Sequence, residues 1–292
     1  MYLNKYYPPK LVAEIGCNHM GSIELAKELI LLAKQSNIQY VKFQKRDILS
    51  LLSKNEYNMP HPVPQNSYGK TYGQHREFLE FSKETHLELF NFCNSNDMIY
   101  STSVWDLISA NEIMELNPSM IKVPSACNNN HDLLNLLFKE YEGEIHISLG
   151  MTYDHEKEDL IKLIDKNNAN DKIVIYACTS GYPVEFKNVC LMEILNIRKY
   201  FNNKVKSFGF SGHHLGIAID IAAYTLGANW IERHFTKDRT YKGTDHAASL
   251  EPSGLFKLNR DLLNTYESLR YKSTELLDIE VEQRQKLKFK KN

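Results

Sequence analysis

Eight strand-like runs alternate with amphipathic stretches along most of the chain, and no other feature of the sequence constrains the fold as strongly. In the amphipathic stretches, apolar residues recur three and four positions apart, which predicts helices with one buried face. These stretches lie at residues 22–37, 75–96, 131–141, 154–166, 216–228 and 255–272. The strand-like runs lie at residues 11–17, 40–44, 98–103, 120–125, 145–150, 172–178, 206–212 and 229–235. Strands that alternate with helices predict a parallel sheet.

Two architectures can hold such a sheet. The chain has 292 residues, close to the roughly 250 residues of a typical (β/α)8 barrel. A doubly wound open sheet is the alternative, but it usually carries a GxGxxG turn after its first strand, and this chain reads GCNHMGS there. We therefore predict an α/β fold, a single (β/α)8 TIM barrel that forms one catalytic domain over residues 1–292.

Residues 46–73 interrupt the pattern. The segment is rich in Pro, Asn and Tyr and shows no clear helix or strand. Loops of this length inside a compact domain are usually functional or disordered. We interpret the segment as a lid over a site, with a disordered loop as the alternative. The basic tail RQKLKFKKN at 284–292 is expected to be a frayed, solvated end.

Composition excludes several classes of function. The formal net charge is -1, so no global field attracts nucleic acid or an acidic membrane surface. No apolar stretch approaches the length of a membrane span or a signal peptide core. The five cysteines are odd in number and form no CxxC pair, which indicates reduced thiols rather than a disulfide framework. We expect a cytoplasmic protein.

Polar side chains stand at the ends of nearly all the predicted strands. Active sites of TIM barrels lie at the C-terminal ends of their strands, and buried charges are costly unless they are paired or bound to a ligand. One such residue would be an ordinary buried polar group, but a whole set predicts a site. The set comprises Glu14, Lys42, Gln44, Thr102, Lys122, Ser125, Ser148, Thr179, His213, Glu232 and His234.

Part of the chemistry follows from the residue types. The ammonium groups of Lys42 and Lys122, with nearby serine hydroxyls, suit a phosphate or carboxylate ligand. His213 and His234 follow neighbouring strands, so their imidazoles are candidates to share one divalent metal. The glutamates at strand ends are candidates for acid–base work or for orienting a hydroxyl.

Eight motifs follow one another along the chain: AEIGCNHMGS, VKFQ, TYGQHREFLEF, YSTSVWD, IKVPSA, GFSGHH, ERHFTKD and GTDHAASLEP. In this order they resemble the sialic acid synthases, the N-acetylneuraminate synthase family, over about residues 10–285. This resemblance implies a TIM barrel that condenses phosphoenolpyruvate with a 2-acetamido sugar aldehyde. It also implies a nine-carbon 3-deoxy-2-ulosonic acid product, release of phosphate, and a divalent cation, Mn²⁺ or Mg²⁺.

The resemblance also implies a role for each site residue. The phosphoenolpyruvate ligands would be Lys42, Thr102, Lys122, Ser125 and Ser148. The metal ligands would be His213 and His234. The sugar ligands would be Gln44, Tyr182, Glu232 and Asp245, and the catalytic groups would be Glu14, Glu232 and Lys42. Arg233 is expected to point outward, because neighbouring residues of a strand face opposite sides.

The chain departs from the family pattern in places. Residues 211–214 read SGHH where the family usually has Ser-Asp-His, so His214 stays an alternative to His213 as ligand. Ser180-Gly181 and Leu149 replace an Asn and a small polar residue near the sugar. The antifreeze-like domain that commonly follows the barrel is absent from residues 1–292, and the acceptor is therefore expected to differ from N-acetylmannosamine.

We expect small-molecule partners, namely phosphoenolpyruvate and an amino-sugar aldehyde, and neither nucleic acid nor membrane. A homodimer is expected, without the usual exchange of that extra domain. Two other classes stay open at this point: a metal-dependent barrel aldolase or hydrolase acting on a sugar, and a non-catalytic binding module. Phosphate release that requires phosphoenolpyruvate, a sugar and a metal would separate them from a synthase.

Overall fold

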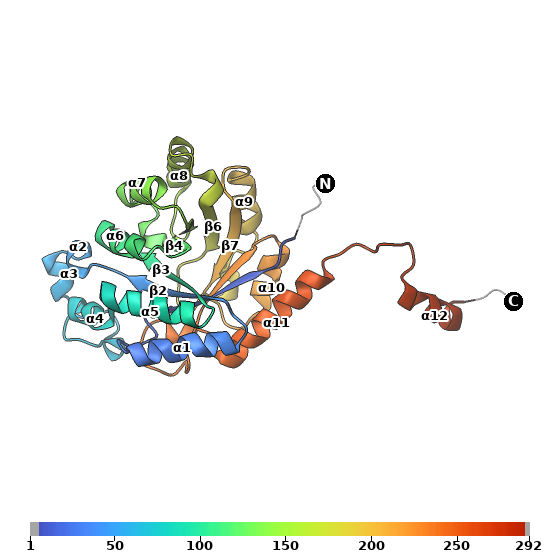
Figure 1. Ribbon diagram of the computed structural model, residues 1–292, viewed down its shortest axis with the longest axis horizontal. Helices are drawn as coiled ribbons and strands as arrows, with labels where there is room; N and C mark the ends of the chain where they lie inside the picture. The colour runs from blue at the N-terminus through green and yellow to red at the C-terminus, as the bar shows by residue number, and fades with distance from the viewer. Residues whose placement is uncertain (1–5, 290–292) are drawn as a thin grey trace.

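The computed structural model describes residues 6–289 and confirms the predicted barrel (Figure 1). Eight parallel strands pair in chain order and close on themselves, since β1 also pairs with β8. The strands are β1 (Lys10–Gly16), β2 (Tyr40–Lys45), β3 (Ile99–Val104), β4 (Met120–Val123), β5 (Glu144–Ser148), β6 (Ile173–Cys178), β7 (Ser207–Gly212) and β8 (Trp230–His234).

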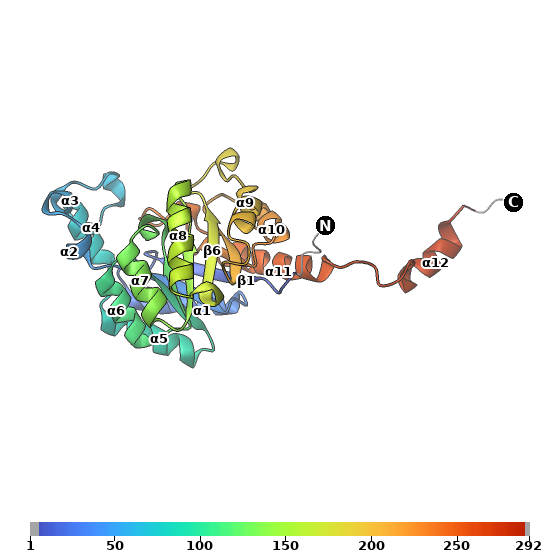
Figure 2. The ribbon, with the colours of Figure 1, turned by 90° about the horizontal axis from the view of Figure 1, so that it is seen from above.

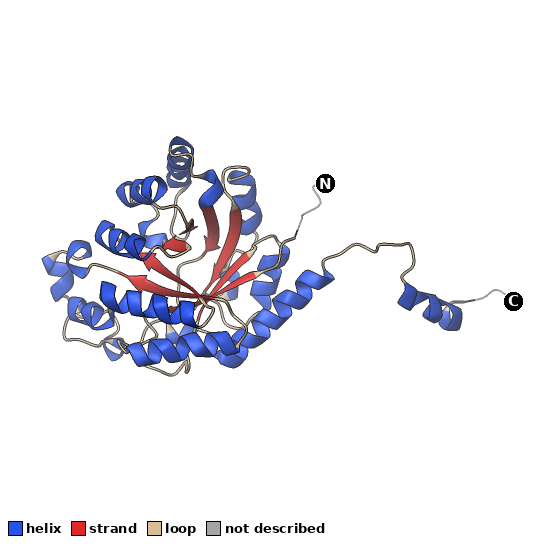
Figure 3. Cartoon of the chain, viewed as in Figure 1, coloured by secondary structure: helices blue, strands red, loops and turns tan. Residues whose placement is uncertain are grey.

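Helices surround the barrel (Figure 3) and bury one apolar face against the outward side chains of the strands. This packing is the main hydrophobic core, and it explains the helical spacing of apolar residues. The surrounding helices are α1 (Ile23–Gln35), α5 (Lys83–Ser95), α6 (Leu107–Leu116), α7 (His131–Glu140), α8 (Asp154–Lys166), α9 (Glu193–Tyr200), α10 (Ala218–Thr225) and α11 (Pro252–Ser268).

The predicted helix at 75–96 is two helices, α4 (Tyr72–Leu79) and α5. Ser82 separates them, because its hydroxyl accepts a hydrogen bond from the Thr85 amide and caps the second helix. The break lies between two apolar stretches with the same spacing, so periodicity alone could not reveal it.

The barrel interior is layered. Side chains of a strand alternate between interior and exterior, and the deepest interior layer is apolar. It comprises Val12, Met120, Val174, Tyr176 and Trp230. On β1, β4 and β8 the inward side chain two residues further along is charged, namely Glu14, Lys122 and Glu232. His146, whose ring packs against Tyr176 and Trp230, is a buried polar group beside the apolar cluster.

The segment 46–73, called the lid segment below, contains helices that were not predicted. They are α2 (Ile48–Leu51), α3 (Lys54–Asn58) and a 3-10 turn (Pro64–Asn66). Asp47 and Ser53 cap the first two. Helices this short have no apolar stripe of readable length, which is why the sequence showed none. Together with α4 they extend from one side of the barrel (Figure 2).

The C-terminal helix α12 (Asp278–Leu287) lies apart from the barrel in both ribbon views (Figures 1 and 2). The tail expected to fray is therefore helical up to Leu287, and residues 290–292 lie outside the described part of the chain. Within residues 6–289, no helix has the length and apolar character needed to cross a bilayer.

Candidate active site

A cavity of about 300 Å³ opens at the C-terminal ends of the strands. Ten of the residues predicted for the site line it, and they come from seven of the eight strands or from the loops that follow them. The ten are Glu14, Lys42, Gln44, Lys122, Ser125, Ser148, Tyr182, His213, Glu232 and His234.

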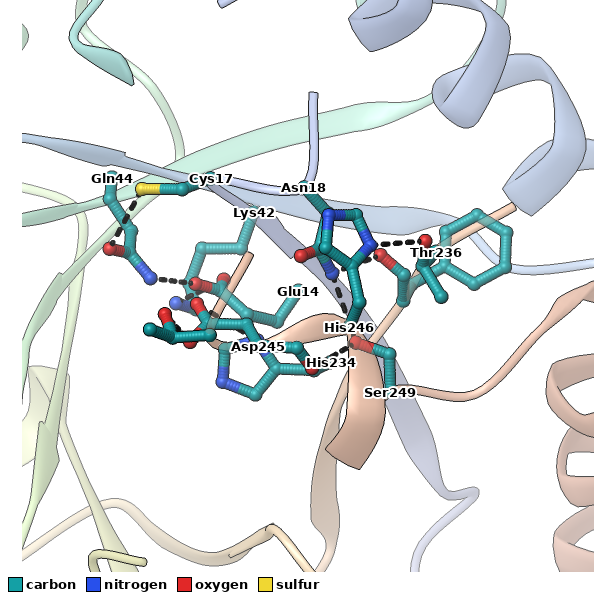
Figure 4. A network of polar contacts seen from close by, with 12 residues as sticks. Glu14, Cys17, Asn18, Lys42, Gln44, His234, Thr236, Asp245, His246 and Ser249 are labelled. Atoms are coloured by element: carbon teal, nitrogen blue, oxygen red, sulfur yellow. Dashed lines mark hydrogen bonds and ion pairs between the residues drawn. The ribbon is translucent and has the colours of Figure 1, made fainter. Parts of the chain in front are cut away.

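Two glutamates and two lysines form the inner charge cluster, which is Glu14, Lys42, Lys122 and Glu232. Each of the four is at most 5% exposed. Lys42 forms an ion pair with Glu14, and Lys122 forms one with Glu232. The Lys42 ammonium also lies 3.8 Å from Glu232, so the two pairs are linked. Figure 4 shows Lys42 and Glu14 beside the strand ends.

The linked charges keep the Glu232 carboxyl ionised. Burial alone would raise its pKa, but the ammonium groups of Lys122 and Lys42 outweigh burial and hold the pKa well below its usual value. Ser211 also donates a hydrogen bond of 3.0 Å to the carboxylate. Because the ammonium groups are fixed by strands, an anion entering the cavity would meet preoriented positive charge.

The prediction for Thr102 chose the wrong face of β3. Thr102 pairs in register with Phe43 and Ile121, whose side chains pack in the outer core, and it does not line the cavity. Its neighbour Ser103 pairs with Gln44 and accepts a 2.8 Å hydrogen bond from the Lys42 ammonium. Ser103 is therefore the β3 hydroxyl of the site.

Two serines predicted to bind the anion lie beside the inner charge cluster. Ser148 is buried, and its hydroxyl has no hydrogen-bond partner among the described residues. Ser125 accepts a 3.0 Å hydrogen bond from the Gly150 amide, which leaves its proton available. Buried polar atoms without partners are costly, so the Ser148 hydroxyl indicates a place for a ligand.

The structure separates the two candidate histidines of the SGHH run. His213 lines the cavity, and its ring lies 5.4 Å from that of His234. His214 is fully buried on the outer side, where Arg233 contacts its ring nitrogen and its carbonyl oxygen. Arg233 also pairs with Asp220 at 2.5 Å, so it faces the helix layer, as the alternation of the strand predicts.

His213 and His234 fit a divalent metal in three respects. The Nδ1 of His213 lies 3.0 Å from the Thr179 carbonyl oxygen, which favours a proton on Nδ1. The lone pair of Nε2 is then free to bind a metal. Burial lowers the pKa of His213 to about 3, so its ring is neutral. The Nδ1 of His234 is buried without a hydrogen-bond partner among the described residues.

Other ligands would have to come from substrate or water, because residues 6–289 contain no group of three His, Cys, Asp or Glu side chains arranged for a metal. Asp245 does not line the cavity, but its carboxylate lies 3.8 Å from Nδ1 of His234 (Figure 4). Burial would raise the pKa of Asp245, but the His234 ring offsets it and the net pKa is lowered. Asp245 therefore lies next to the histidine pair.

Gln44 is held in one orientation. Its amide nitrogen donates to Glu14 at 2.8 Å, and Arg46 donates to its carbonyl oxygen. Arg46 is itself fixed by an ion pair with Glu80 at 3.1 Å and by stacking on Trp105. The sequence did not reveal this contact, because Arg46 and Glu80 lie 34 residues apart in the chain.

The tyrosine predicted to touch the sugar is half exposed at the cavity mouth. The Tyr182 ring lies 4.3 Å from the His213 ring and 5.8 Å from the His234 ring. Two further hydroxyls, those of Ser103 and Ser211, also line the cavity. Extending the alternation two positions back from His213 would have found Ser211, whereas Ser103 is the neighbour of Thr102 on the opposite face of β3.

A model of the NeuB family matches residues 29–274, which is most of the chain. The chain belongs to the NeuB family. It is 34% identical to the N-acetylneuraminate-9-phosphate synthase of Homo sapiens, over 96% of this chain and 77% of that protein. It is 33% identical to the N,N'-diacetyllegionaminic acid synthase of Campylobacter jejuni, over 84% and 72% of the two chains.

A solved structure supports the fold of this NeuB member. The N-acetylneuraminic acid synthetase of Leptospira borgpetersenii superposes with a TM-score of 0.80 at 24% identity, covering 97% of this chain and 94% of the other. The resemblance predicted from the motifs is thereby confirmed, and so is the prediction of a synthase-type enzyme, since the curated relatives are synthases.

Proposed function

We propose that this NeuB protein condenses phosphoenolpyruvate with a 2-acetamido sugar aldehyde and releases phosphate. The observation that carries the proposal is one cavity that holds two lysines, on β2 and β4, and two histidines, at the ends of the neighbouring strands β7 and β8. The lysines suit the anion, and the histidines suit a metal at the aldehyde. The aldolase and hydrolase alternatives give the lysine and serine set no comparable purpose.

Phosphoenolpyruvate would bind at the lysine side of the cavity. Lys122 and Lys42 supply positive charge, while Ser148 and Ser125 have hydroxyl protons to donate. Charge-assisted hydrogen bonds of this kind are the strong ones. Ser103, rather than Thr102, would complete the set, since it already contacts Lys42.

The acceptor sugar would bind at the histidine side. His213 and His234 would hold the divalent ion, and its chemistry there would be Lewis-acid polarisation of the aldehyde oxygen. Gln44 and Tyr182 line the same side and offer an amide and a hydroxyl to the sugar. Asp245, above His234, is placed to accept a hydrogen bond from a sugar hydroxyl.

Phosphoenolpyruvate, the sugar aldehyde and one water molecule account for all atoms of the two products. The enol carbon of phosphoenolpyruvate forms a bond to the aldehyde carbon, and a water molecule adds to the carbon that bears the phosphate ester. The carbon–oxygen bond of the ester then breaks, phosphate leaves with the electron pair, and the water oxygen becomes the ketone. Glu14 and Glu232 are the candidate groups to accept and return the protons.

We further propose that residues 1–292 act as one catalytic barrel domain and that the lid segment covers the bound sugar. Its helices follow β2 directly, beside Gln44 and Arg46. The metal would be Mn²⁺ or Mg²⁺, and the proposed compartment is the cytoplasm. The identity of the acceptor is a finer question, since relatives are named for both phosphorylated and unphosphorylated products.

A phosphate-release assay tests the proposal. The purified protein receives phosphoenolpyruvate with or without Mn²⁺ and with members of a sugar panel: 2-acetamido, 2,4-diacetamido and unmodified hexoses, with their 6-phosphates. We expect phosphate release only when sugar and metal are both present, together with a product whose carbon count exceeds that of the sugar by three. Phosphate release without a sugar would indicate a phosphatase and would overturn the proposal.

A further inference from the structure

A tyrosine lies beside one lysine of the inner charge cluster, and the mechanism above gives it no role. Tyr176, on β6, is fully buried and belongs to the deepest layer of the barrel interior. The Lys122 ammonium lies 4.5 Å from the centre of its ring. The negative face of an aromatic ring attracts an ammonium group, and the attraction is strongest away from water. The ring is therefore a second contact of Lys122, beside the Glu232 carboxylate.

The barrel wall has room for this ring because the facing residue is a glycine. Tyr176 pairs in register with Gly209 of β7. A Cβ atom at Gly209 would lie 2.6 Å from a carbon of the Tyr176 ring, which is too close for two carbon atoms. Any larger residue at position 209 would push the ring from its place. The position of the ring is thus set by two neighbouring strands.

A hydrogen-bonded chain holds the other end of the ring. The Tyr176 hydroxyl lies 2.8 Å from Nδ1 of His146, a fully buried residue of β5. Nε2 of His146 lies 3.4 Å from the Glu144 carboxylate, at the start of the same strand. Glu144 also pairs with Lys206 at 2.6 Å. The chain therefore runs from the Tyr176 ring to the opposite end of the barrel.

The charge states along this chain fix the direction of each hydrogen bond. Burial lowers the pKa of His146, so its ring is neutral at pH 7 and carries one proton. The hydrogen bond from His146 lowers the pKa of Glu144 to about 2. An ionised carboxylate only accepts, so Nε2 of His146 carries the proton and Nδ1 accepts from the Tyr176 hydroxyl. Donation by the hydroxyl polarises the phenol and makes its ring more negative.

We propose that Tyr176 is a positioning residue whose ring holds the Lys122 ammonium in place for the anion that enters the cavity. The inference rests on the proposed function, which assigns phosphoenolpyruvate to Lys122. The four-carbon stem of a lysine is flexible, and a side chain that is already held loses less freedom when its ligand binds. The ring also offsets part of the cost of keeping a buried ammonium charged.

The test measures the Kd of phosphoenolpyruvate by calorimetry without a sugar, so that no turnover occurs. Position 176 carries phenylalanine, 4-fluorophenylalanine, 3,5-difluorophenylalanine or 3,4,5-trifluorophenylalanine. The four rings have nearly the same shape and all lack the hydroxyl, but each added fluorine makes the ring face less negative. We expect Kd to rise with each fluorine, by roughly tenfold across the set. Equal Kd values across the set would overturn the proposal.

A double variant tests whether the ring acts through Lys122. Tyr176→Leu removes the ring and should raise Kd for phosphoenolpyruvate by roughly tenfold or more. The same change in a Lys122→Met background should have no further effect, because the ammonium is already gone. If Tyr176→Leu weakens binding as much in both backgrounds, the ring serves the fold alone and the proposal is overturned.

A second buried tyrosine provides a matched control. Tyr100 lies on β3, and its hydroxyl is 2.6 Å from Nδ1 of His86, but its side chain packs in the outer core. Tyr100→Leu therefore breaks a similar buried pair without touching the cavity, and Kd for phosphoenolpyruvate should stay unchanged. A rise equal to that of Tyr176→Leu would mean that any loosening of the barrel weakens binding, and it would overturn the proposal.

The same measurements separate this inference from the proposed function. If wild type does not bind phosphoenolpyruvate, the proposed function fails and the role of Tyr176 fails with it. If wild type binds phosphoenolpyruvate and condenses it with a sugar, but Kd is the same across the fluorinated set, only the inference about Tyr176 is wrong.

Discussion

The inner charge cluster and two cations that do not line the cavity, Arg76 and Lys242, differ in how the fold holds them. Glu14, Lys42, Lys122 and Glu232 stand on strands, are nearly inaccessible to solvent and pair with one another. Arg76 stands on α4 and Lys242 on the loop between β8 and α11, and they contact tyrosines rather than carboxylates. The charges of the inner cluster neutralise one another and are fixed in place. The positive charges of Arg76 and Lys242 have tyrosine contacts instead.

The difference indicates that the two regions have separate roles. Buried ions are costly unless they are paired with good geometry. We therefore expect a set of paired ions on rigid strands where the position of each charge matters to the chemistry. Groups on loops can change without disturbing the barrel. We therefore assign the condensation to the strand ends, and the choice of acceptor to the lid segment and its neighbours.

Metal removal should produce the largest effect, because it reaches the chemistry itself. Lewis-acid activation is worth several kcal/mol, so chelation or His234→Ala should lower kcat by roughly a thousandfold. His155→Ala, a change at an exposed histidine, is the control and should keep full activity. Wild-type rates after exhaustive chelation would show that the histidine pair has no part in the reaction.

Removing one inner lysine should come next. Lys122→Met should raise KM for phosphoenolpyruvate by roughly tenfold to a hundredfold and affect KM for the sugar much less. It should also lower thermal stability, because the Glu232 carboxylate loses its partner.

The double variant Lys122→Met/Glu232→Gln separates these two effects. Neutralising both partners should recover most of the thermal stability but none of the affinity for phosphoenolpyruvate. Recovery of both would mean that the lysine serves the fold alone, and the inner cluster would lose its catalytic assignment.

Shortening the lid segment should act on the acceptor alone. Deleting residues 55–65 removes α3 residues and the 3-10 turn but keeps Tyr68 and all strand-borne groups. We expect KM for the sugar to rise by roughly tenfold, about the effect of one strong contact. KM for phosphoenolpyruvate and the thermal midpoint should hardly change. Unchanged sugar kinetics would show that this segment does not cover the acceptor.

The smallest effect is expected for the lid residue that contacts the loop of Lys242. Tyr68→Phe removes the hydrogen bond to the Lys242 carbonyl but keeps the ring beneath the ammonium. A single neutral hydrogen bond is worth about 1 kcal/mol, so KM for the sugar should rise about fivefold. An equal rise in KM for phosphoenolpyruvate would show that the two regions are not independent.

The barrel and most of the inner site were predictable because they depend on simple periodicities. Strand ends in a TIM barrel share one face, so polar residues at those ends converge whatever the details of the loops. The same rule correctly placed Arg233 outside and Glu232 inside. It was misapplied at Thr102, where pairing Lys42 and Gln44 across to β3 would have selected Ser103 instead.

The contacts of the lid segment were not predictable to the same degree. These contacts join residues far apart in the chain, such as Tyr68 with Lys242 and Arg46 with Glu80. No periodicity links such pairs, and helices of four or five residues leave no pattern to detect. The choice between His213 and His214 as candidate metal ligand likewise depended on the three-dimensional structure, because the sequence does not show that Arg233 and Asp220 surround His214.

The most direct test of the account follows the bridging oxygen of phosphoenolpyruvate. The enzyme is given Mn²⁺, its best sugar and phosphoenolpyruvate whose bridging oxygen, between carbon 2 and phosphorus, is ¹⁸O, and both products are analysed by mass spectrometry. The account predicts that the label leaves with phosphate and that an acid with three more carbons than the sugar forms without it. Label retained in the organic product would mean phosphorus–oxygen cleavage, and it would contradict the condensation assigned to the strand ends.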